Sequence, residues 1–217
     1  MNCSKFTRQF WRQYIMLEKE FASTEQFVTL HPDNSNTFSS AYSKLLLQIG
    51  SEVDIVAKVL CQIHEPTFSG DNINQYMTKL LSVYPDFEII QVEVINTGII
   101  VEPWKDWSIK SPSWWTVYNK VKHDRTKTGS VDSVQKEYYK FANQNYTLSA
   151  LSGLFQLLIY SYYQLSVQEG KRIPVPLPGS RILKLNGSHW SDMQFIGDDR
   201  FYLDNGHQIL ETPDFPY

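Results

Sequence analysis

The most restrictive feature of this sequence is an almost continuous apolar segment at residues 147–167. Its apolar side chains recur at alternating spacings of three and four, and further apolar residues cover the other faces of the same helix. A helix that is apolar on most sides must be surrounded by other elements, so this segment predicts the central helix of a bundle. Serine, glycine and glutamine interrupt the stretch at 148–163, and we therefore expect no membrane-spanning segment here.

Periodic patterns elsewhere predict the elements around this helix. Further helices are expected at residues 4–27, 38–63, 73–83, 113–125 and 134–142. Isoleucine and valine dominate residues 87–101 around an Asn-Thr-Gly turn, which predicts a β-hairpin. Two tryptophans and two prolines in residues 102–112 indicate a linker ordered by aromatic packing. After a proline-rich connector at 172–179, ILKL and FYLDNGHQIL predict short strands, the latter turning at Asn205-Gly206.

We therefore predict a mainly α fold, a helical bundle with small β-hairpin additions. The bundle domain would comprise residues 1–168, with the hairpin insertion near 87–101. Residues 169–217 would form the proline-rich connector and a C-terminal β extension.

Composition limits the functional classes. The 217 residues carry a formal net charge of -3, so binding to nucleic acid or an acidic membrane would have to come from a local patch. Two cysteines, Cys3 and Cys61, cannot form a disulfide framework, which favours a reducing compartment. The amphipathic start lacks the apolar core of a signal peptide. We expect a cytoplasmic protein that does not contact membranes.

Chemistry-bearing residues gather in SWWTVYNKVKHDRTK, residues 113–127. At 100° per residue, one side of this helix combines Trp114, Tyr118, Val121 and Arg125, and the adjoining side combines Trp115, Asn119, Lys122 and His123. Lys120 and Asp124 point elsewhere and are expected to form a solvated ion pair. Polar groups at the edge of an apolar stripe are placed where a cleft between helices would open.

His123 is the leading candidate for proton transfer, because its ordinary pKa near 6.5 suits a general acid or base. Lys122 and Arg125 are candidates for binding a phosphate. The alternative interpretation is a basic helix end that interacts only with the helix dipole.

Glu52 adds to this interpretation. It lies at the border of the apolar stripe of the helix at 38–63, and a buried carboxylate usually has a cationic partner. Arg125, Lys122 and His123 are the candidates, unless Glu52 is exposed enough to need none. Asp54 and Lys58 are expected to point away.

The order of these segments resembles the HEPN superfamily of helical-bundle proteins. The resemblance covers residues 39–167 and rests on AYSKLLLQIGSEVDIVAKVLCQI, on the basic histidine motif YNKVKHDR and on the apolar TLSALSGLFQLLIYSYYQL. It implies RNA cleavage without metal, usually across a dimer interface, in toxin–antitoxin or defence systems. His123 matches the histidine of that family. The family arginine would stand at residues 116–118, which are Thr-Val-Tyr, and Arg125 follows the histidine instead.

Two functional hypotheses follow. In a metal-independent endoribonuclease of a bacterial defence or toxin–antitoxin system, His123 would transfer protons, Arg125 and Lys122 would stabilise the phosphorane, and Asn119 would orient the substrate. Glu52 and Tyr118 would contact these catalytic groups and hold them in position. The partners would be RNA, a second copy of the chain or an antitoxin. The other hypothesis is a non-catalytic module that binds a protein or a nucleotide.

Neither hypothesis uses a cofactor. The five histidines are too far apart in sequence to predict a zinc site. Tryptophans 104, 107, 114 and 115 are able to stack on bases, but such a cluster is more typical of a core or an interface.

Overall fold

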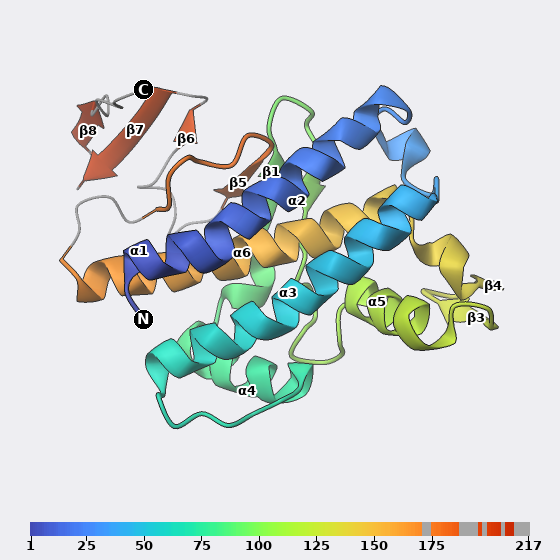
Figure 1. Cartoon of the computed structure of the whole chain (residues 1–217), viewed down its shortest axis with the longest axis horizontal. Helices are drawn as coiled ribbons and strands as arrows, with labels where there is room; N and C mark the ends of the chain where they lie inside the picture. The colour runs from blue at the N-terminus through green and yellow to red at the C-terminus, as the bar shows by residue number, and fades with distance from the viewer. Residues whose placement is uncertain (171–174, 187–194, 197–198, 205–206, 211–217) are drawn as a thin grey trace.

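The computed structural model describes residues 1–170 and 175–186 in full, and the backbone of residues 195–196, 199–204 and 207–210. The fold is mainly helical, with small antiparallel sheets (Figure 1). Its α-helices are α1 (Cys3–Phe6), α2 (Arg12–Ser23), α3 (Ser40–His64), α4 (Ile73–Val83), α5 (Ser113–Asp124) and α6 (Gln144–Gln168). None of the helices among these residues has the length and apolar character to cross a bilayer.

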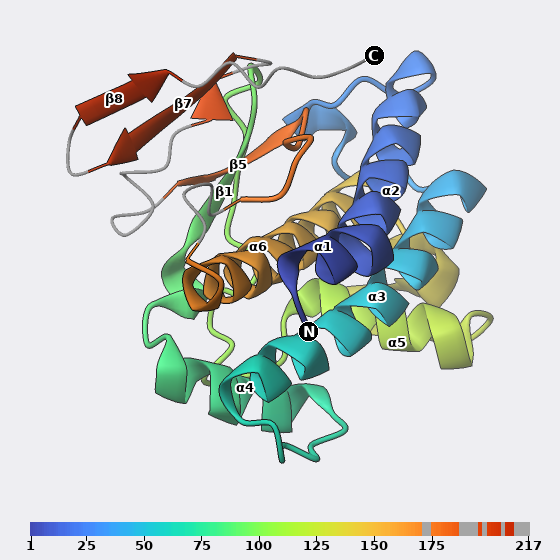
Figure 2. The same cartoon turned by 60° about the vertical axis from the view of Figure 1, so that its left-hand side comes forward.

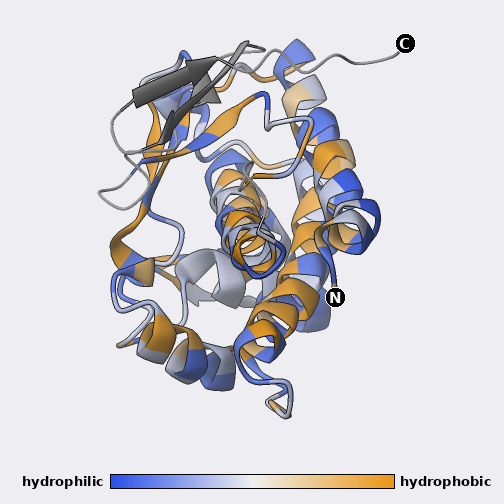
Figure 3. Cartoon of the chain, turned by 90° about the vertical axis from the view of Figure 1, so that its left-hand side faces the viewer, coloured by the Kyte–Doolittle hydropathy of each residue, from blue (hydrophilic) through white to orange (hydrophobic). Residues whose placement is uncertain are grey.

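Helix α6 is the central element, as its sequence predicts. Seen end-on, it lies in the middle of the molecule with the other helices around it (Figure 3). Its buried residues occupy every face, and its most extensive contact is with α3. The helix begins three residues before the predicted start, because the Asn143 side chain accepts the backbone N–H of Tyr146 at 2.9 Å and caps the first turn.

The N-terminal helix departs from the single regular helix predicted at 4–27. A five-residue π-helix, Thr7–Trp11, separates α1 from α2, and a 3₁₀ turn, Thr24–Gln26, follows α2. The wider turn changes the register of the residues that follow it. Trp11 and Tyr14 stack on each other at 4.8 Å, and Tyr14 stacks on Phe155 of α6 at 5.6 Å.

The strands form three small antiparallel sheets. Strand β1 (Gln91–Val94) pairs with β2 (Ile100–Val101), which confirms the hairpin predicted at 87–101, and on its other side with β5 (Leu183–Asn186). Pairing of β1 with β5 joins segments about ninety residues apart and has no local sequence signal. Strand β7 (Asp199–Asp204) pairs with β8 (His207–Leu210), as predicted, whereas the turn at 205–206 lies outside the described residues. Strand β7 also pairs with β6 (Phe195–Ile196), which was not predicted.

The helix predicted at 134–142 is wrong. Strands β3 (Thr128–Val131) and β4 (Val134–Glu137) form a hairpin, and a 3₁₀ turn, Tyr138–Phe141, follows. The turn residues Asp132 and Ser133 have positive φ without glycine. Tertiary contacts stabilise this turn, because the Asp132 carboxylate accepts hydrogen bonds from the hydroxyls of Ser113 at 2.7 Å and Tyr146 at 2.9 Å.

Aromatic packing orders the linker at 102–112, as predicted. Trp104 and Trp107 are fully buried with ring centroids 4.2 Å apart, and the indole N–H of Trp114 donates to the carbonyl of Pro103 at 2.7 Å. Trp115 is also buried. The four tryptophans thus belong to the core and present no ring faces to a nucleic acid.

Candidate nucleic-acid interface

Helix α5 carries most of the predicted site, and the core determines its orientation. Its buried face consists of Trp114, Trp115, Val117, Tyr118 and Val121. The Tyr118 ring lies directly on Gly50 of α3, where a Cβ atom would overlap it. Tyr118 is therefore a packing residue between two helices.

His123, Lys122 and Arg125 are exposed to solvent. His123 follows the buried Val121 by two positions, which places it about 200° around the helix, on the side away from the core. Within the described part of the chain, the side chains of His123 and Arg125 make no hydrogen bond or ion pair. The three residues share one helix end but do not enclose a cleft.

Asn119 is half-buried and faces its own helix. Its side-chain amide donates to the carbonyl of Trp115 at 3.0 Å, one turn earlier. The amide of Asn119 is thus engaged with the backbone.

Asp54, which we expected to point away, lies within reach of groups on α4 and α5. Burial raises the pKa of Asp54, and the nearby ammonium groups of Lys122 and Lys58 act in the opposite direction on that pKa. The Tyr76 hydroxyl also hydrogen-bonds to the Asp54 carboxylate. Lys122 lies 5.4 Å from the centroid of the Tyr118 ring. The charge on α3 that Lys122 faces is therefore that of Asp54.

Glu52 is half-buried, and burial raises the pKa of its carboxyl group. No cation among the described residues pairs with it. The structure thus places Glu52 on α3 without joining it to His123.

The hairpin β3–β4 and the 3₁₀ turn pack beside the end of α5 (Figure 1). The backbone N–H of Tyr139 donates to the carbonyl of Arg125 at 3.2 Å, and that of Tyr138 donates to Lys127 at 2.9 Å. Residues 120–140 contain six Lys or Arg and three Asp or Glu, a net charge of +3 in a chain of net charge -3. We call this surface the basic corner: Lys120, Lys122, His123, Arg125, Lys127, Lys136 and Lys140.

Aromatic rings hold several of these cations in place. Ammonium groups lie over rings at 5.3 Å (Lys120 on Tyr138), 4.5 Å (Lys136 on Phe141) and 5.5 Å (Lys140 on Tyr139). Lys120 and Lys127 also pair with Asp124, at 3.6 and 2.6 Å, and Lys140 with Glu137 at 2.6 Å. The first of these pairs confirms the ion pair predicted on α5. Such solvated pairs are weak, so they leave the lysines available to a polyanion.

Two exposed aromatic residues beside the basic corner were not predicted. Phe38 is 44% exposed and Tyr139 is 37% exposed, and their rings meet edge to face at 5.7 Å. The spacing of four between Phe38 and Tyr42 fits the apolar stripe of α3, so the periodic pattern predicts that Phe38 is a core residue. It precedes the first turn of α3, however, and forms a β-bridge with Asn143 instead.

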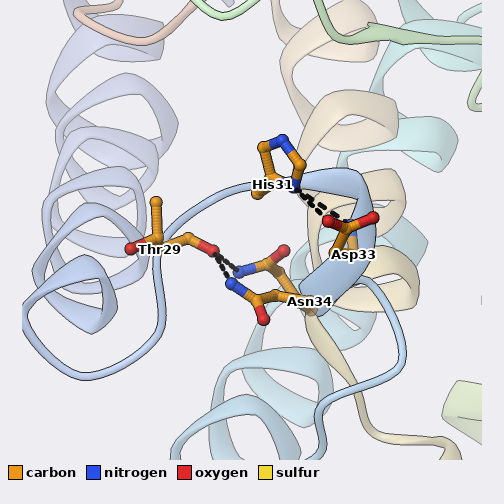
Figure 4. Close-up of polar contacts among 5 residues, drawn as sticks. Thr29, His31, Asp33 and Asn34 are labelled. Carbon is orange, nitrogen blue, oxygen red and sulfur yellow. Dashed lines mark hydrogen bonds and ion pairs between the residues drawn. The ribbon is translucent and has the colours of Figure 1, made fainter.

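A hydrogen-bonded loop precedes Phe38 in the chain (Figure 4). Asn34 donates to the carbonyl of Thr29 at 2.9 Å, and His31 Nδ1 accepts the N–H of Asp33 at 3.2 Å. His31 therefore caps the short 3₁₀ helix Pro32–Asn34. Among the described residues, no three His, Cys, Asp or Glu side chains gather as a metal site would require.

The comparisons with known proteins do not identify the chain. No family model, curated protein or solved structure matches it. The HEPN resemblance stays a prediction.

Proposed function

We propose that this chain is a non-catalytic RNA-binding module and that the basic corner is its binding surface. The observation that carries this proposal is the local excess of positive charge at residues 120–140 in a chain of negative net charge. Arg125 and Lys136 form no ion pair within the described part of the chain. The backbone carbonyl of Arg125 accepts the N–H of the exposed Tyr139, and the Lys136 ammonium lies over the Phe141 ring.

Electrostatics explains why the corner would favour RNA. Lysines and arginines that neutralise phosphates release condensed counterions, and this release supplies most of the sequence-independent affinity. The rings of Phe38 and Tyr139 offer faces on which unpaired bases stack, regardless of sequence. Three to five phosphate contacts would give a slope of log affinity against log salt of about -2 to -3.5.

The test compares RNA binding by the wild type with that by Arg125→Glu/Lys136→Glu. Fluorescence anisotropy with a labelled mixed-sequence RNA between 50 and 200 mM salt should show affinity for the wild type and a loss of at least about tenfold in the variant. The matched control, Lys5→Glu/Lys105→Glu, makes the same change in net charge at two exposed lysines outside the basic corner. Equal losses of RNA affinity in both variants would show that binding depends on net charge alone, and would refute the proposal that the basic corner is the binding surface.

A metal-independent endoribonuclease is the second candidate, and the exposed His123 favours it. Its imidazole has no hydrogen bond within the described residues and lies beside Lys122 and near Arg125. An acceptor for the 2′-hydroxyl proton and cations for the phosphorane are chemically sufficient for cleavage. Because His123 faces away from the bundle, a second proton-transfer group would come from outside α5, for example from a second copy in a homodimer.

Cleavage assays separate the two candidates. Wild type and His123→Ala are incubated with the same RNA in the presence of a chelator. Cleavage by the wild type alone would support the nuclease. Binding with only background cleavage by both proteins supports the non-catalytic module.

A further inference from the structure

A groove between the N-terminal helix and α6 holds part of the chain's own C-terminal region. Trp11, Tyr14, Phe155 and Ile159 supply its apolar wall, and Glu18 of α2 lies at one end. We call residues 175–183 the strap, because they run across this groove after α6 and lead into β5. Figure 2 shows this part of the chain close to α1 and α6.

The apolar half of the groove closes tightly on the strap. Pro176, Gly179 and Leu183 cover Trp11, Phe155 and Ile159, and no space for a water molecule is left between them. The indole N–H of Trp11 donates to the backbone carbonyl of Pro178 at 2.7 Å. The strap thus contacts the groove through ring packing and through one backbone carbonyl.

Glu18 supplies the polar half. Glu18 is only 2% exposed, and its carboxylate accepts four hydrogen bonds: from the Ser180 hydroxyl, from the Tyr14 hydroxyl at 3.0 Å, and from the backbone N–H groups of Arg181 at 3.2 Å and Ile182 at 3.4 Å. No cation among the described residues forms an ion pair with it. A buried carboxylate without a cation depends on such donors, and three of the four come from the strap.

We propose that this groove is a peptide-recognition site and that the strap is its resident ligand within the same chain. The preferred ligand has the chemistry that the strap presents: a Pro-Gly-Ser segment in which an apolar residue stands three positions after the serine. A partner protein with an exposed segment of this kind would make the same contacts with Trp11, Phe155 and Glu18. The partner segment would compete with the strap. Because the strap belongs to the same chain, its effective concentration is high, and the partner segment must bind tightly enough to displace it. This site is separate from the basic corner.

The test uses the full-length chain and a labelled peptide with the sequence of residues 175–186. Ser180→Ala removes one strap donor to Glu18, and Ser180→Ala/Pro176→Ala also removes a ring from the apolar contact, while every groove residue stays intact. Because a weaker resident ligand competes less, fluorescence anisotropy should show peptide affinity rising at least about tenfold from the wild type to the opened variants. A peptide with alanine at the serine should bind at least about tenfold more weakly.

Adding Glu18→Gln to an opened variant should weaken peptide binding, because the amide keeps one acceptor oxygen and places an NH2 donor where the other oxygen accepts the N–H of Arg181. If the double variant does not fold, as judged by circular dichroism, Ser180→Ala alone decides the question. Absence of binding by a folded opened variant, or binding that Glu18→Gln leaves unchanged, overturns the proposal. Dimerisation of the opened variant without peptide overturns it as well, since the occupant would then be the strap of a second copy.

Discussion

Contacts between single residues determine how α5 sits on α3. Gly50 has no side chain, and the Tyr118 ring occupies the space that a Cβ atom would need. Gly50 lies in the regular helix α3, where the backbone conformation does not require a glycine. Its role is to let the two helices approach closely. This contact turns the other side of α5, with His123, toward solvent.

Gly50→Ala should therefore destabilise the protein by about 1–3 kcal/mol, because the ring and the helix must shift to admit one methyl group. Urea unfolding followed by circular dichroism measures the change. Ser51→Ala, at the exposed neighbouring position on α3, should change stability by less than about 0.5 kcal/mol. A Gly50→Ala variant as stable as the wild type would contradict this packing, and Tyr118→Ala should reduce the penalty of Gly50→Ala when the two are combined.

Interactions between elements join the ends of α3 and α4. His64, the last residue of α3, has its Nε2 atom 2.7 Å from the hydroxyl of Tyr84, which follows α4. The two rings meet edge to face, and Tyr84 packs in the same way on Tyr160 of α6. This contact connects three helices through one titratable group.

Burial lowers the pKa of His64 below its ordinary value of 6.5, and the Lys79 ammonium lowers it further. The unfolded chain therefore binds a proton at this position more readily than the folded chain does. This contribution to stability is complete above about pH 7 and decreases as pH falls below 6.5, until the folded histidine is also protonated. Thermal midpoints at pH 8 and pH 5 should differ more for the wild type than for His64→Gln. His31→Gln, in an exposed loop, should behave like the wild type, and identical acid losses in all three would refute the role of His64.

At the scale of elements, sequence patterns predicted which helices and strands exist better than they predicted which segments pair with one another. The Ile/Val-rich stretch around Asn-Thr-Gly identified β1 and β2, because a hairpin is a local structure. The hairpin β3–β4 was mistaken for a helix, because its turn owes its conformation to contacts of Asp132 with Ser113 and Tyr146. These partners lie 19 and 14 residues away, outside the range of a local pattern.

At the scale of the whole molecule, both cysteines belong to one continuous core. Cys3 and Cys61 are fully buried, and burial raises the pKa of the Cys61 thiol to about 12. Because the thiolate is the reactive form, a buried thiol of high pKa is inert near neutral pH.

The native protein should therefore react with a thiol reagent such as DTNB at pH 8 only as fast as the molecule opens. Unfolding in guanidinium should release both thiols at once, and Cys3→Ser and Cys61→Ser should assign them. Rapid modification of Cys61 in the native state would show that α3 and α4 open locally.

The sequence by itself determined the central position of α6, since a segment that is apolar on most sides is stable only when other elements surround it. It also determined the residue types of the candidate site. Only the tertiary structure decided where those residues face. Periodicity ranks the sides of a helix by polarity, and it cannot tell the edge of a cleft from open solvent. The packing of Tyr118 on Gly50 turned His123 outward, and hydrogen bonding to Glu18 placed the strap on a groove that no local pattern marks, because both depend on residues distant in the chain.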